Sequence, residues 1–210
     1  MATPIYHFTH RDNFASILAS DGMLCDRICQ NSGLTARDIA YSSLKAKRMR
    51  TAVEVPPYRT LGDYVPFYFG VKSPMLFTYK NGRVTGSPEN QDELIYLAAT
   101  AEAIAGAGIA FAFTDGHPVR EPKAFFNDLA CLCKVDLPLM TQRDWYDCDE
   151  DPDRMRRRQA EFLVYQRFTW EHVQAIGVRT EAMATWVGEA IRDMPYKPPC
   201  LIRPSWYYPG

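Results

Sequence analysis

The sequence predicts an α+β fold, on three observations about its expected elements. Short apolar runs typical of strands, such as residues 64–71 and 160–165, outnumber the amphipathic segments typical of helices. The two kinds of element are interleaved irregularly, without an internal repeat, a linker or a low-complexity stretch. Of the 210 residues, 47% are hydrophobic and 23% are charged, which is the balance of a chain that buries a core. We therefore expect residues 1–210 to form a single domain.

The N-terminal segment predicts a strand followed by a helix. Residues 5–8 read as a short strand, in which His7 and Thr9, two positions apart, point to one face. Asp12 then precedes apolar residues with helical spacing at positions 14, 17 and 18. Because Asp is a favoured N-cap and Gly follows such helices, we expect a helix that starts after Asp12 and stops at Gly22.

The next part of the chain predicts a basic loop, an aromatic strand and a polar loop. Residues 45–59 hold five basic residues and end in a Pro-Pro pair, which favours a loop. An aromatic strand is expected over Tyr64–Leu76, with residues 64–71 as its buried part. Residues 80–93 are polar and contain an Asn-Gly pair, so they read as a loop.

Residues 94–113 are apolar over the length that a membrane span requires. The run carries Glu102, and a carboxylate at mid-membrane costs about 2.5–3.5 kcal/mol. It also divides into a strand at 94–98, a short helix opened by Thr100, and a second strand at 109–113. We therefore expect a strand–helix–strand unit and no membrane span.

The C-terminal half predicts one more strand and one more helix. Residues 115–134 form an irregular connection, and residues 160–165 (AEFLVY) read as a strand. Thr180 opens a helix that Pro195 stops, and the proline-rich end is an edge strand or coil. The apolar face of that helix consists of Met183, Trp186, Val187, Ile191 and Met194.

Composition and missing motifs exclude several classes of protein. The chain has 24 Lys and Arg against 25 Asp and Glu, which argues against non-specific coating of nucleic acid but permits a local basic groove. The six cysteines form no CxxC pair and no signal peptide precedes them, so we expect reduced thiols in a cytoplasmic protein and no metal site. Without a P-loop, GxGxxG, HExxH or GxSxG motif, kinases, Rossmann dehydrogenases, zincins and serine hydrolases are excluded.

Glu161 is the most informative single residue. It begins an apolar strand, where an ionised carboxylate is costly unless it has a partner. One interpretation is an ion pair with one of the three consecutive arginines Arg156, Arg157 and Arg158. The other is a carboxylate held beside a substrate that develops positive charge or offers a hydroxyl group.

Three further features are candidates for binding. The His7–Thr9 pair beside Asn13 suits a polar ligand such as a ribose, and His117, in a loop, is expected to exchange protons near neutral pH. The basic residues are either solvated faces or the lining of a groove for a phosphate backbone, with aromatic side chains to stack on bases. Those basic residues are Lys45, Lys47, Arg48, Arg50, Arg154, Arg156, Arg157 and Arg158.

Several segments together resemble the DarT family, bacterial toxins that ADP-ribosylate DNA. The matching stretches are IYHFTHRDNFASIL (5–18), the Lys47-Arg48 loop, TLGDYVPFYFGVKSPMLF (60–77), AFTDGH (112–117) and DPDRMRRRQAEFLVY (151–165). They occur in the family's order and span most of the chain.

The resemblance implies an ADP-ribosyltransferase fold, in which a split antiparallel β-sheet with peripheral helices holds NAD+ in a cleft. It implies that Glu161 is the catalytic glutamate, that Arg48 is the family's functional arginine, and that His117 lies in the loop facing the substrate. No metal is implied.

The resemblance also implies which residues bind the two substrates. His7 and Thr9 bind the adenine-side ribose and the nicotinamide region of NAD+, and Phe8 offers its backbone to the carboxamide. Asn13 belongs to the same motif, and Tyr68 lies near the nicotinamide. Met75 is expected to line the target base. Together with Met75, the residues expected on the DNA side are Lys47, Arg50, Lys72, Arg154 and Arg157.

The implied reaction transfers ADP-ribose from NAD+ to a base of single-stranded DNA. The expected acceptor is N3 of thymine, with guanine left open. Glu161 stabilises the ribosyl cation, and Arg48, His117 or Glu161 assists loss of the base proton. A transferase acting on RNA, or a non-catalytic nucleic-acid-binding or NAD-sensing module, is the alternative. A macrodomain antitoxin that reverses the modification is the implied partner.

Overall fold

The computed structural model describes residues 2–34, 37, 39, 41–84, 86, 88–142 and 144–209. An eight-stranded sheet runs through it in the order β10-β9-β4-β1-β3-β7-β5-β6, and only the β9–β10 pair is parallel. Its strands are β1 (Pro4–His10), β3 (Tyr64–Tyr68), β4 (Leu94–Thr100), β5 (Phe111–Thr114), β6 (Phe125–Phe126), β7 (Glu161–Tyr165), β9 (Ala175–Val178) and β10 (Cys200–Ile202). A separate small sheet pairs β2 (Gly22–Leu24) with β8 (Arg167–Thr169).

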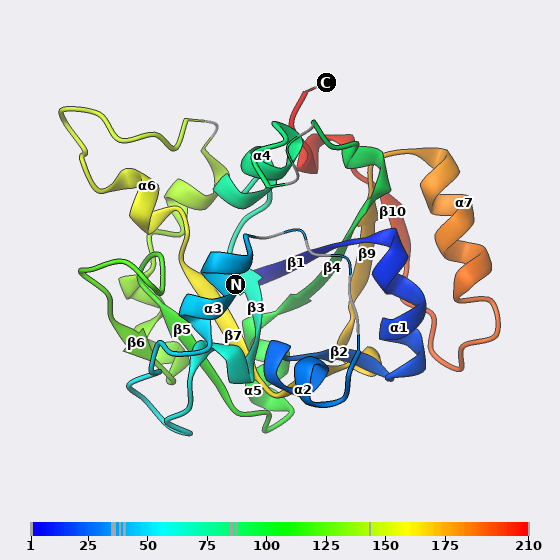
Figure 1. Cartoon of the computed structure of the whole chain (residues 1–210), viewed down its shortest axis with the longest axis horizontal. Helices are drawn as coiled ribbons and strands as arrows, with labels where there is room; N and C mark the ends of the chain where they lie inside the picture. The colour runs from blue at the N-terminus through cyan, green and yellow to red at the C-terminus, as the bar shows by residue number, and fades with distance from the viewer. Residues whose placement is uncertain are drawn as a thin grey trace.

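Short helices join the strands, as Figure 1 shows. The α-helices are α1 (Phe14–Ala19), α2 (Asp26–Asn31), α3 (Ser42–Arg48), α4 (Pro74–Lys80), α5 (Ala101–Gly106), α6 (Arg154–Arg157) and α7 (Glu181–Ala190). Single 3₁₀ turns or short 3₁₀ helices are Arg11–Asn13, Leu61–Asp63, Gln91–Glu93, Leu129–Lys134, Pro138–Thr141, Trp170–His172 and Pro204–Trp206.

The large sheet is split between β1 and β3. These neighbours share one residue pair, Tyr6 with Tyr68, whereas β1 and β4 pair over seven residues and β3 and β7 over five. The one shared pair holds the two halves together at one end, and beyond it β1 and β3 diverge. The predicted split antiparallel sheet is thereby confirmed, apart from the parallel edge pair.

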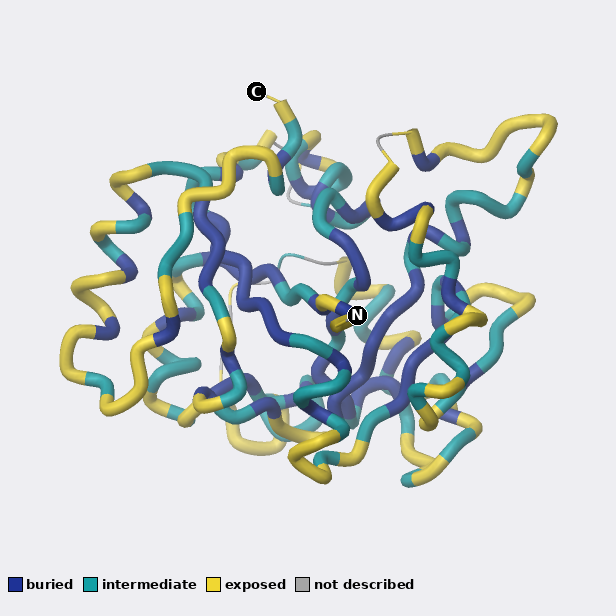
Figure 2. The backbone as a smooth tube through the Cα atoms, turned by 180° about the vertical axis from the view of Figure 1, so that it is seen from behind, coloured by how far each residue is buried: buried dark blue, intermediate teal, exposed yellow. Residues whose placement is uncertain are grey.

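Burial is nearly continuous along the central strands β4 and β7, so both faces of the sheet are covered by apolar packing. One cluster covers one face of both halves and contains Val65 and Phe67 of β3 together with residues of α1, α5 and α7. On the opposite face Tyr64 and Tyr68 of the same strand belong to two separate clusters. Figure 2 shows the buried residues concentrated in the central strands. The apolar packing of this second face is therefore interrupted at β3.

The strand predictions are largely confirmed. The apolar run 94–113 is β4, then α5 capped by the Thr100 hydroxyl, then β5, as expected. Residues 160–165 contain β7, and Thr180 caps α7 by accepting from the Met183 N–H. The proline-rich end contributes the edge strand β10. In the polar loop 80–93, residues 85 and 87 lie outside the described residues.

Five details of the prediction are wrong. The chain leaves β1 through a 3₁₀ turn capped by His10, which accepts from the Asp12 N–H, so Asp12 is not the cap of α1. The aromatic strand ends at Tyr68 because the Ser73 hydroxyl caps α4 and Pro74 occupies its first turn, where a proline needs no N–H partner. Helix α7 ends at Ala190, before Pro195.

The fourth detail concerns the basic segment. Residues 42–48 form α3, so Arg48 ends a helix and does not lie in a loop. Gly22 also has a different role from the predicted helix stop, because α1 ends at Ala19 and Gly22 starts β2. Its φ of +124° and a Cβ position 2.2 Å from the Phe168 carbonyl oxygen leave room for glycine alone.

Candidate functional site

A cavity of about 220 Å³ lies at the split of the sheet. His7, Phe8 and Thr9 line it from β1, and Pro66 and Tyr68 line it from β3. Because β1 and β3 diverge beyond the Tyr6–Tyr68 pair, the space that a sheet ordinarily fills with hydrogen bonds is open to a ligand. The sequence-predicted NAD+ residues on these strands therefore come together at one place.

His7 spans the gap between the two strands. Its Nδ1 lies 2.7 Å from the Pro66 carbonyl oxygen, which only accepts hydrogen bonds, so Nδ1 carries the proton and Nε2 is an acceptor. Burial lowers the pKa of His7, which keeps the ring neutral in this tautomer. His7 thus presents a hydrogen-bond acceptor to the cavity.

Asn13 connects β1 to the segment at the cavity's outer wall. Its Nδ2 donates to the Thr9 hydroxyl at 3.1 Å and to the Arg37 carbonyl at 3.0 Å, and its Oδ1 accepts from the Arg37 N–H at 2.6 Å. The Arg37 guanidinium in turn pairs with Asp12 and Glu89. The side chain of Asn13 therefore fixes both a cavity-lining hydroxyl and the backbone of a second cavity-lining residue.

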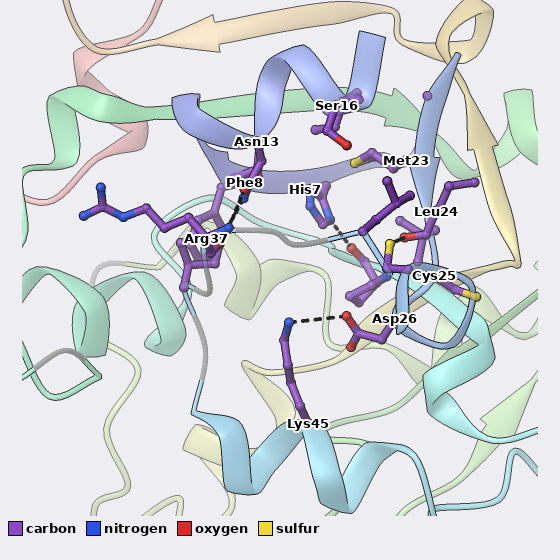
Figure 3. Close-up of a pocket in the computed structure, with 18 of the residues that line it drawn as sticks. His7, Phe8, Asn13, Ser16, Met23, Leu24, Cys25, Asp26, Arg37 and Lys45 are labelled. Carbon is purple, nitrogen blue, oxygen red and sulfur yellow. Dashed lines mark hydrogen bonds and ion pairs between the residues drawn. The ribbon is translucent and has the colours of Figure 1, made fainter. Parts of the chain in front are cut away.

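The opposite wall contains Asp26 and neighbouring residues that sequence reasoning missed, together with Lys45, which was predicted only as one of the basic residues. Figure 3 shows Asp26 of α2 and Lys45 of α3 pointing toward one another, with 3.5 Å between Oδ1 and Nζ. Met23, Leu24 and Cys25 complete this wall from β2 and the residue before α2. Helix α2 has six residues and no side-chain N-cap, so its short segment carries little pattern to find.

Arg48 and Glu161 form a buried ion pair at the cavity. The Arg48 Nη1 donates to Glu161 Oε2 at 2.8 Å and to Oε1 at 3.1 Å, and the residues are 7% and 5% exposed. Burial raises the pKa of Glu161, and the guanidinium of Arg48 opposes that shift. Among the described residues the buried Arg48 Nη2 has no hydrogen-bond partner, so it is a donor that neither a carboxylate nor a backbone carbonyl satisfies.

The partner of Glu161 differs from the one that spacing favoured. Arg156 pairs with Asp153 and Asp115, and Arg158 donates to the Val71 carbonyl at 2.6 Å, so none of the neighbouring arginines binds Glu161. The ion-pair interpretation correctly required a cationic partner but named the wrong ones. Arg48 comes instead from α3, which is distant in sequence.

Two contacts fix Glu161 in position. Its backbone N–H donates to the Thr114 hydroxyl at 3.1 Å, and that hydroxyl donates to the Gly116 carbonyl at 2.6 Å. On the other side Glu161 is paired in register with Tyr68 of β3. Tyr68 stacks on Phe8 with 6.2 Å between ring centroids, and burial raises its pKa. An aromatic wall thus lies beside the carboxylate.

A second hollow, of about 650 Å³, adjoins the cavity. Leu44 and Met75 line both spaces, so they separate one from the other. Lys47 and His117 line the second hollow, whereas the adjacent Arg48 lines the cavity. The predicted DNA-side residues Lys47 and Met75 therefore lie next to the catalytic candidates.

His117 differs from the sequence expectation. Burial lowers its pKa to about 4, and the nearby charges of Arg120, Arg48 and Lys47 add to the shift. Its Nδ1 accepts from the Val119 N–H at 3.2 Å. The expected proton exchange near neutral pH is therefore wrong, and its role in relaying the base proton stays a prediction.

The remaining predicted DNA residues line neither space. Arg157 pairs with Asp136 at 2.6 Å and with Asp151, and Arg154 donates to the Gln142 side chain at 2.8 Å. Lys72 has a φ of +56° at the turn before α4, and Arg50 is exposed after α3. Their contacts with DNA stay predictions.

Other properties of the described residues bear on the class of site. All six cysteines are free, and Cys25 and Cys29 line the cavity with their pKa values raised by burial. Within the described ranges no three His, Cys, Asp or Glu side chains gather as a metal site needs, and no helix has the length and apolar character of a membrane span.

The sheet is split and mostly antiparallel, with a His and a Thr on one side of the opening and a buried Arg–Glu pair on the other. This arrangement defines an ADP-ribosyltransferase fold. The chain belongs to the DarT family, whose model, described as "ssDNA thymidine ADP-ribosyltransferase, DarT", matches residues 6–208. The family that the sequence motifs resembled is thereby confirmed.

Relatives and solved structures agree with this assignment. A protein of Thermus sp. (strain 2.9), named DNA ADP-ribosyl transferase, is 36% identical over 208 residues, which cover 98% of this chain and 96% of the relative. The structure of Thermus sp. 2.9 DarT in complex with ADP-ribosylated ssDNA superposes with a TM-score of 0.90 at 35% identity, covering 99% of this chain and 97% of that one. The same protein in complex with NAD+ gives a TM-score of 0.86 at 34% identity over 99% and 98%.

Proposed function

We propose that this DNA ADP-ribosyltransferase transfers ADP-ribose from NAD+ to N3 of thymine in single-stranded DNA and releases nicotinamide. The observation that carries the proposal is the buried Arg48–Glu161 pair beside a cavity at the split of the sheet, whose Arg48 Nη2 has no partner in the described part of the chain. A buried donor without a partner costs free energy, so a substrate acceptor at that position is favoured.

The cavity offers the groups that NAD+ needs. The Nε2 of His7 accepts a hydrogen bond from a ribose hydroxyl, and Thr9, fixed by Asn13, offers its own hydroxyl beside it. Phe8 and Tyr68 provide a flat apolar wall for the nicotinamide ring. NAD+ is the co-substrate in this proposal, and no metal takes part.

Glu161 acts on the ribose from which nicotinamide leaves. As the bond from C1″ to the nicotinamide nitrogen breaks, the electron pair leaves with nicotinamide and positive charge develops on the ribose. The carboxylate accepts a hydrogen bond from the 2″-hydroxyl and stabilises that charge more strongly in the transition state than before it. Its fixed position costs no reorganisation at the moment of reaction.

The base attacks through N3, which forms the new bond to C1″ and loses its proton. The Arg48 Nη2 is placed to donate to an oxygen of the base as negative charge develops there. Of the residues that the resemblance implies for this step, Glu161 and His117 can take the proton, and the lowered pKa of His117 favours Glu161. Arg48 thus orients the base. Glu161 first stabilises the positive charge on the ribose and then takes the proton from N3.

Single-stranded DNA fits because N3 of thymine is paired in a duplex, and extruding the base costs a few kcal/mol. The test compares one sequence as single-stranded DNA, as duplex DNA and as RNA, each with NAD+, by mass spectrometry. We expect modification of the single-stranded DNA alone. Faster modification of the RNA would favour the alternative RNA transferase, and the absence of nicotinamide release with every substrate would favour a non-catalytic module.

We propose that this chain is a cytoplasmic toxin and that a macrodomain antitoxin reverses its modification of DNA. The proposal rests on the family alone. Inducing the chain in a bacterial host is expected to arrest growth, and co-expression of a macrodomain that removes ADP-ribose from DNA is expected to restore it. Growth unaffected by the active chain would contradict the toxin role.

A further inference from the structure

The second hollow contains an aromatic pair that the reaction described so far does not use. Trp145 and Tyr146 lie in its wall, 4.1 Å apart between ring centroids and inclined by 24°, so the two rings are stacked. Trp145 is 5% exposed, whereas Tyr146 is 52% exposed. A large aromatic ring is thus held at the surface with its inner face on another ring and its outer side open to solvent.

The stack is rigidly supported from behind. The Trp145 indole N–H donates to the Tyr208 hydroxyl at 2.9 Å, and that hydroxyl donates to the Lys72 carbonyl at 2.6 Å. Phe77 of α4 meets both Trp145 and Tyr146 edge-on, at 5.7 and 6.2 Å. The orientation of Tyr146 is therefore fixed without a ligand, which lowers the entropic cost of stacking another ring on it.

The charge that lines the second hollow suits a nucleic acid strand, although Asp144 and Asp147 flank the stack in the sequence. Lys47, Arg83 and Arg120 line the same hollow, and His117 stays neutral there. Of the described residues that line it, none is an Asp or a Glu. Three cations beside an aromatic platform are what a phosphate backbone with an unstacked base requires.

The hollow is also in the right place relative to the reaction. It is separated from the Arg48–Glu161 cavity by Leu44 and Met75, which line both spaces. A base that reaches Glu161 therefore has its neighbouring nucleotide in the second hollow. Continuity with the reacting site identifies the occupant as the same DNA strand.

We propose that the base adjacent to the target base stacks on the outer face of Tyr146, with its phosphates near Lys47, Arg83 and Arg120. This inference rests on the proposed function, since it takes single-stranded DNA as the substrate. Tyr146 is then a residue that selects and holds the flanking nucleotide, and Trp145 positions it. Every base has a face that can stack, so this contact discriminates only weakly among the four bases. It discriminates more strongly between a neighbouring base and an abasic position.

The experiment removes each partner in turn. Single-turnover rates are measured for single-stranded oligonucleotides with one thymine, in which an abasic site replaces one neighbouring base at a time. The proteins are the wild type, Tyr146→Ala, Tyr146→Phe and Tyr58→Ala. Tyr58 is a matched control because it is 68% exposed and lines neither space.

We expect one abasic position to slow the wild type and Tyr146→Phe about 5- to 150-fold, which is the range of one stacked base. Tyr146→Ala should be slowed by a similar factor on the complete oligonucleotide and show no further loss at that position. Tyr58→Ala should match the wild type. If every abasic effect persists unchanged in Tyr146→Ala, the inference is overturned. A wild type that modifies none of the oligonucleotides would instead contradict the proposed function.

Discussion

Arg48 Nη1 lies 2.8 Å from Glu161 Oε2, although 113 residues separate the two side chains along the sequence. The pair joins the end of α3 to the start of β7, and both groups are buried. A buried charge is tolerated only with its partner present, so each residue sets the protonation and the stability of the other.

Arg48→Ala should be strongly destabilising, because it leaves the Glu161 carboxylate buried and unpaired. We expect a loss of roughly 3–5 kcal/mol in the free energy of unfolding, measured by denaturant titration with circular dichroism. Arg48→Ala combined with Glu161→Gln should lose less than Arg48→Ala alone, since no charge is then left unpaired. Equal losses in the single and double variants would mean that the pair is not coupled.

Arg48→Lys separates charge from hydrogen-bond geometry. The lysine retains the ion pair with Glu161 but lacks the second guanidinium nitrogen that has no partner in this structure. We expect near-normal stability, a turnover reduced about 10²-fold and an unchanged KM for NAD+. Thermal unfolding and initial rates of oligonucleotide modification test this. A full-speed Arg48→Lys variant would remove the role given to Nη2.

Asn13→Ala tests the outer wall of the cavity. The substitution removes the hydrogen bonds to Thr9 and to the backbone of Arg37. We expect the KM for NAD+ to rise about tenfold, the effect of one or two hydrogen bonds, with little change in turnover. Asn127→Ala is the matched control, since Asn127 is exposed and lines neither space. Equal KM values in the two variants would contradict the assignment of Asn13.

The lowered pKa of His117 predicts how the stability of the protein depends on pH. Its pKa is lowered from 6.5 to about 4, chiefly by burial, so the unfolded chain binds the proton more readily than the folded one. The contribution of neutral His117 to the free energy of unfolding is therefore fully present above pH 6.5 and is lost as the pH falls toward 4. We expect the difference in unfolding free energy between the wild type and His117→Gln to shrink over that interval. A difference independent of pH would show that His117 does not titrate in this way.

Much of the sheet follows from local pattern. The Leu94–Thr100 strand, the helix capped by Thr100 and the strand that Glu161 begins are each specified by runs of residues close in sequence. The extent of the aromatic strand was misread because the Ser73-Pro74 helix start follows directly on apolar residues. The register that leaves β1 and β3 with one shared pair depends on packing between distant segments, which local periodicity does not encode.

Most residues of the site could be predicted from the sequence, but which of them pair with one another could not. Glu161 stood out as a carboxylate opening an apolar strand, but its spacing favoured the adjacent arginines over Arg48. Asp26 of the cavity wall was missed because its helix is short and weakly patterned, and its ion pair with the predicted basic residue Lys45 joins two helices that local pattern does not connect. The Trp145–Tyr146 pair did carry a signal, two adjacent aromatic residues within an acidic segment, whose meaning required the neighbouring hollow.

The most direct test of the account is the rate at which the wild type and Glu161→Gln modify a single-stranded oligonucleotide with one thymine in the presence of NAD+. Mass spectrometry and nicotinamide release are followed together, with an oligonucleotide carrying N3-methylthymine as the control. We predict that the wild type adds one ADP-ribose to thymine and none to N3-methylthymine, and that Glu161→Gln is slower by about 10²–10³-fold. A Glu161→Gln variant as fast as the wild type, or modification of N3-methylthymine, would contradict it.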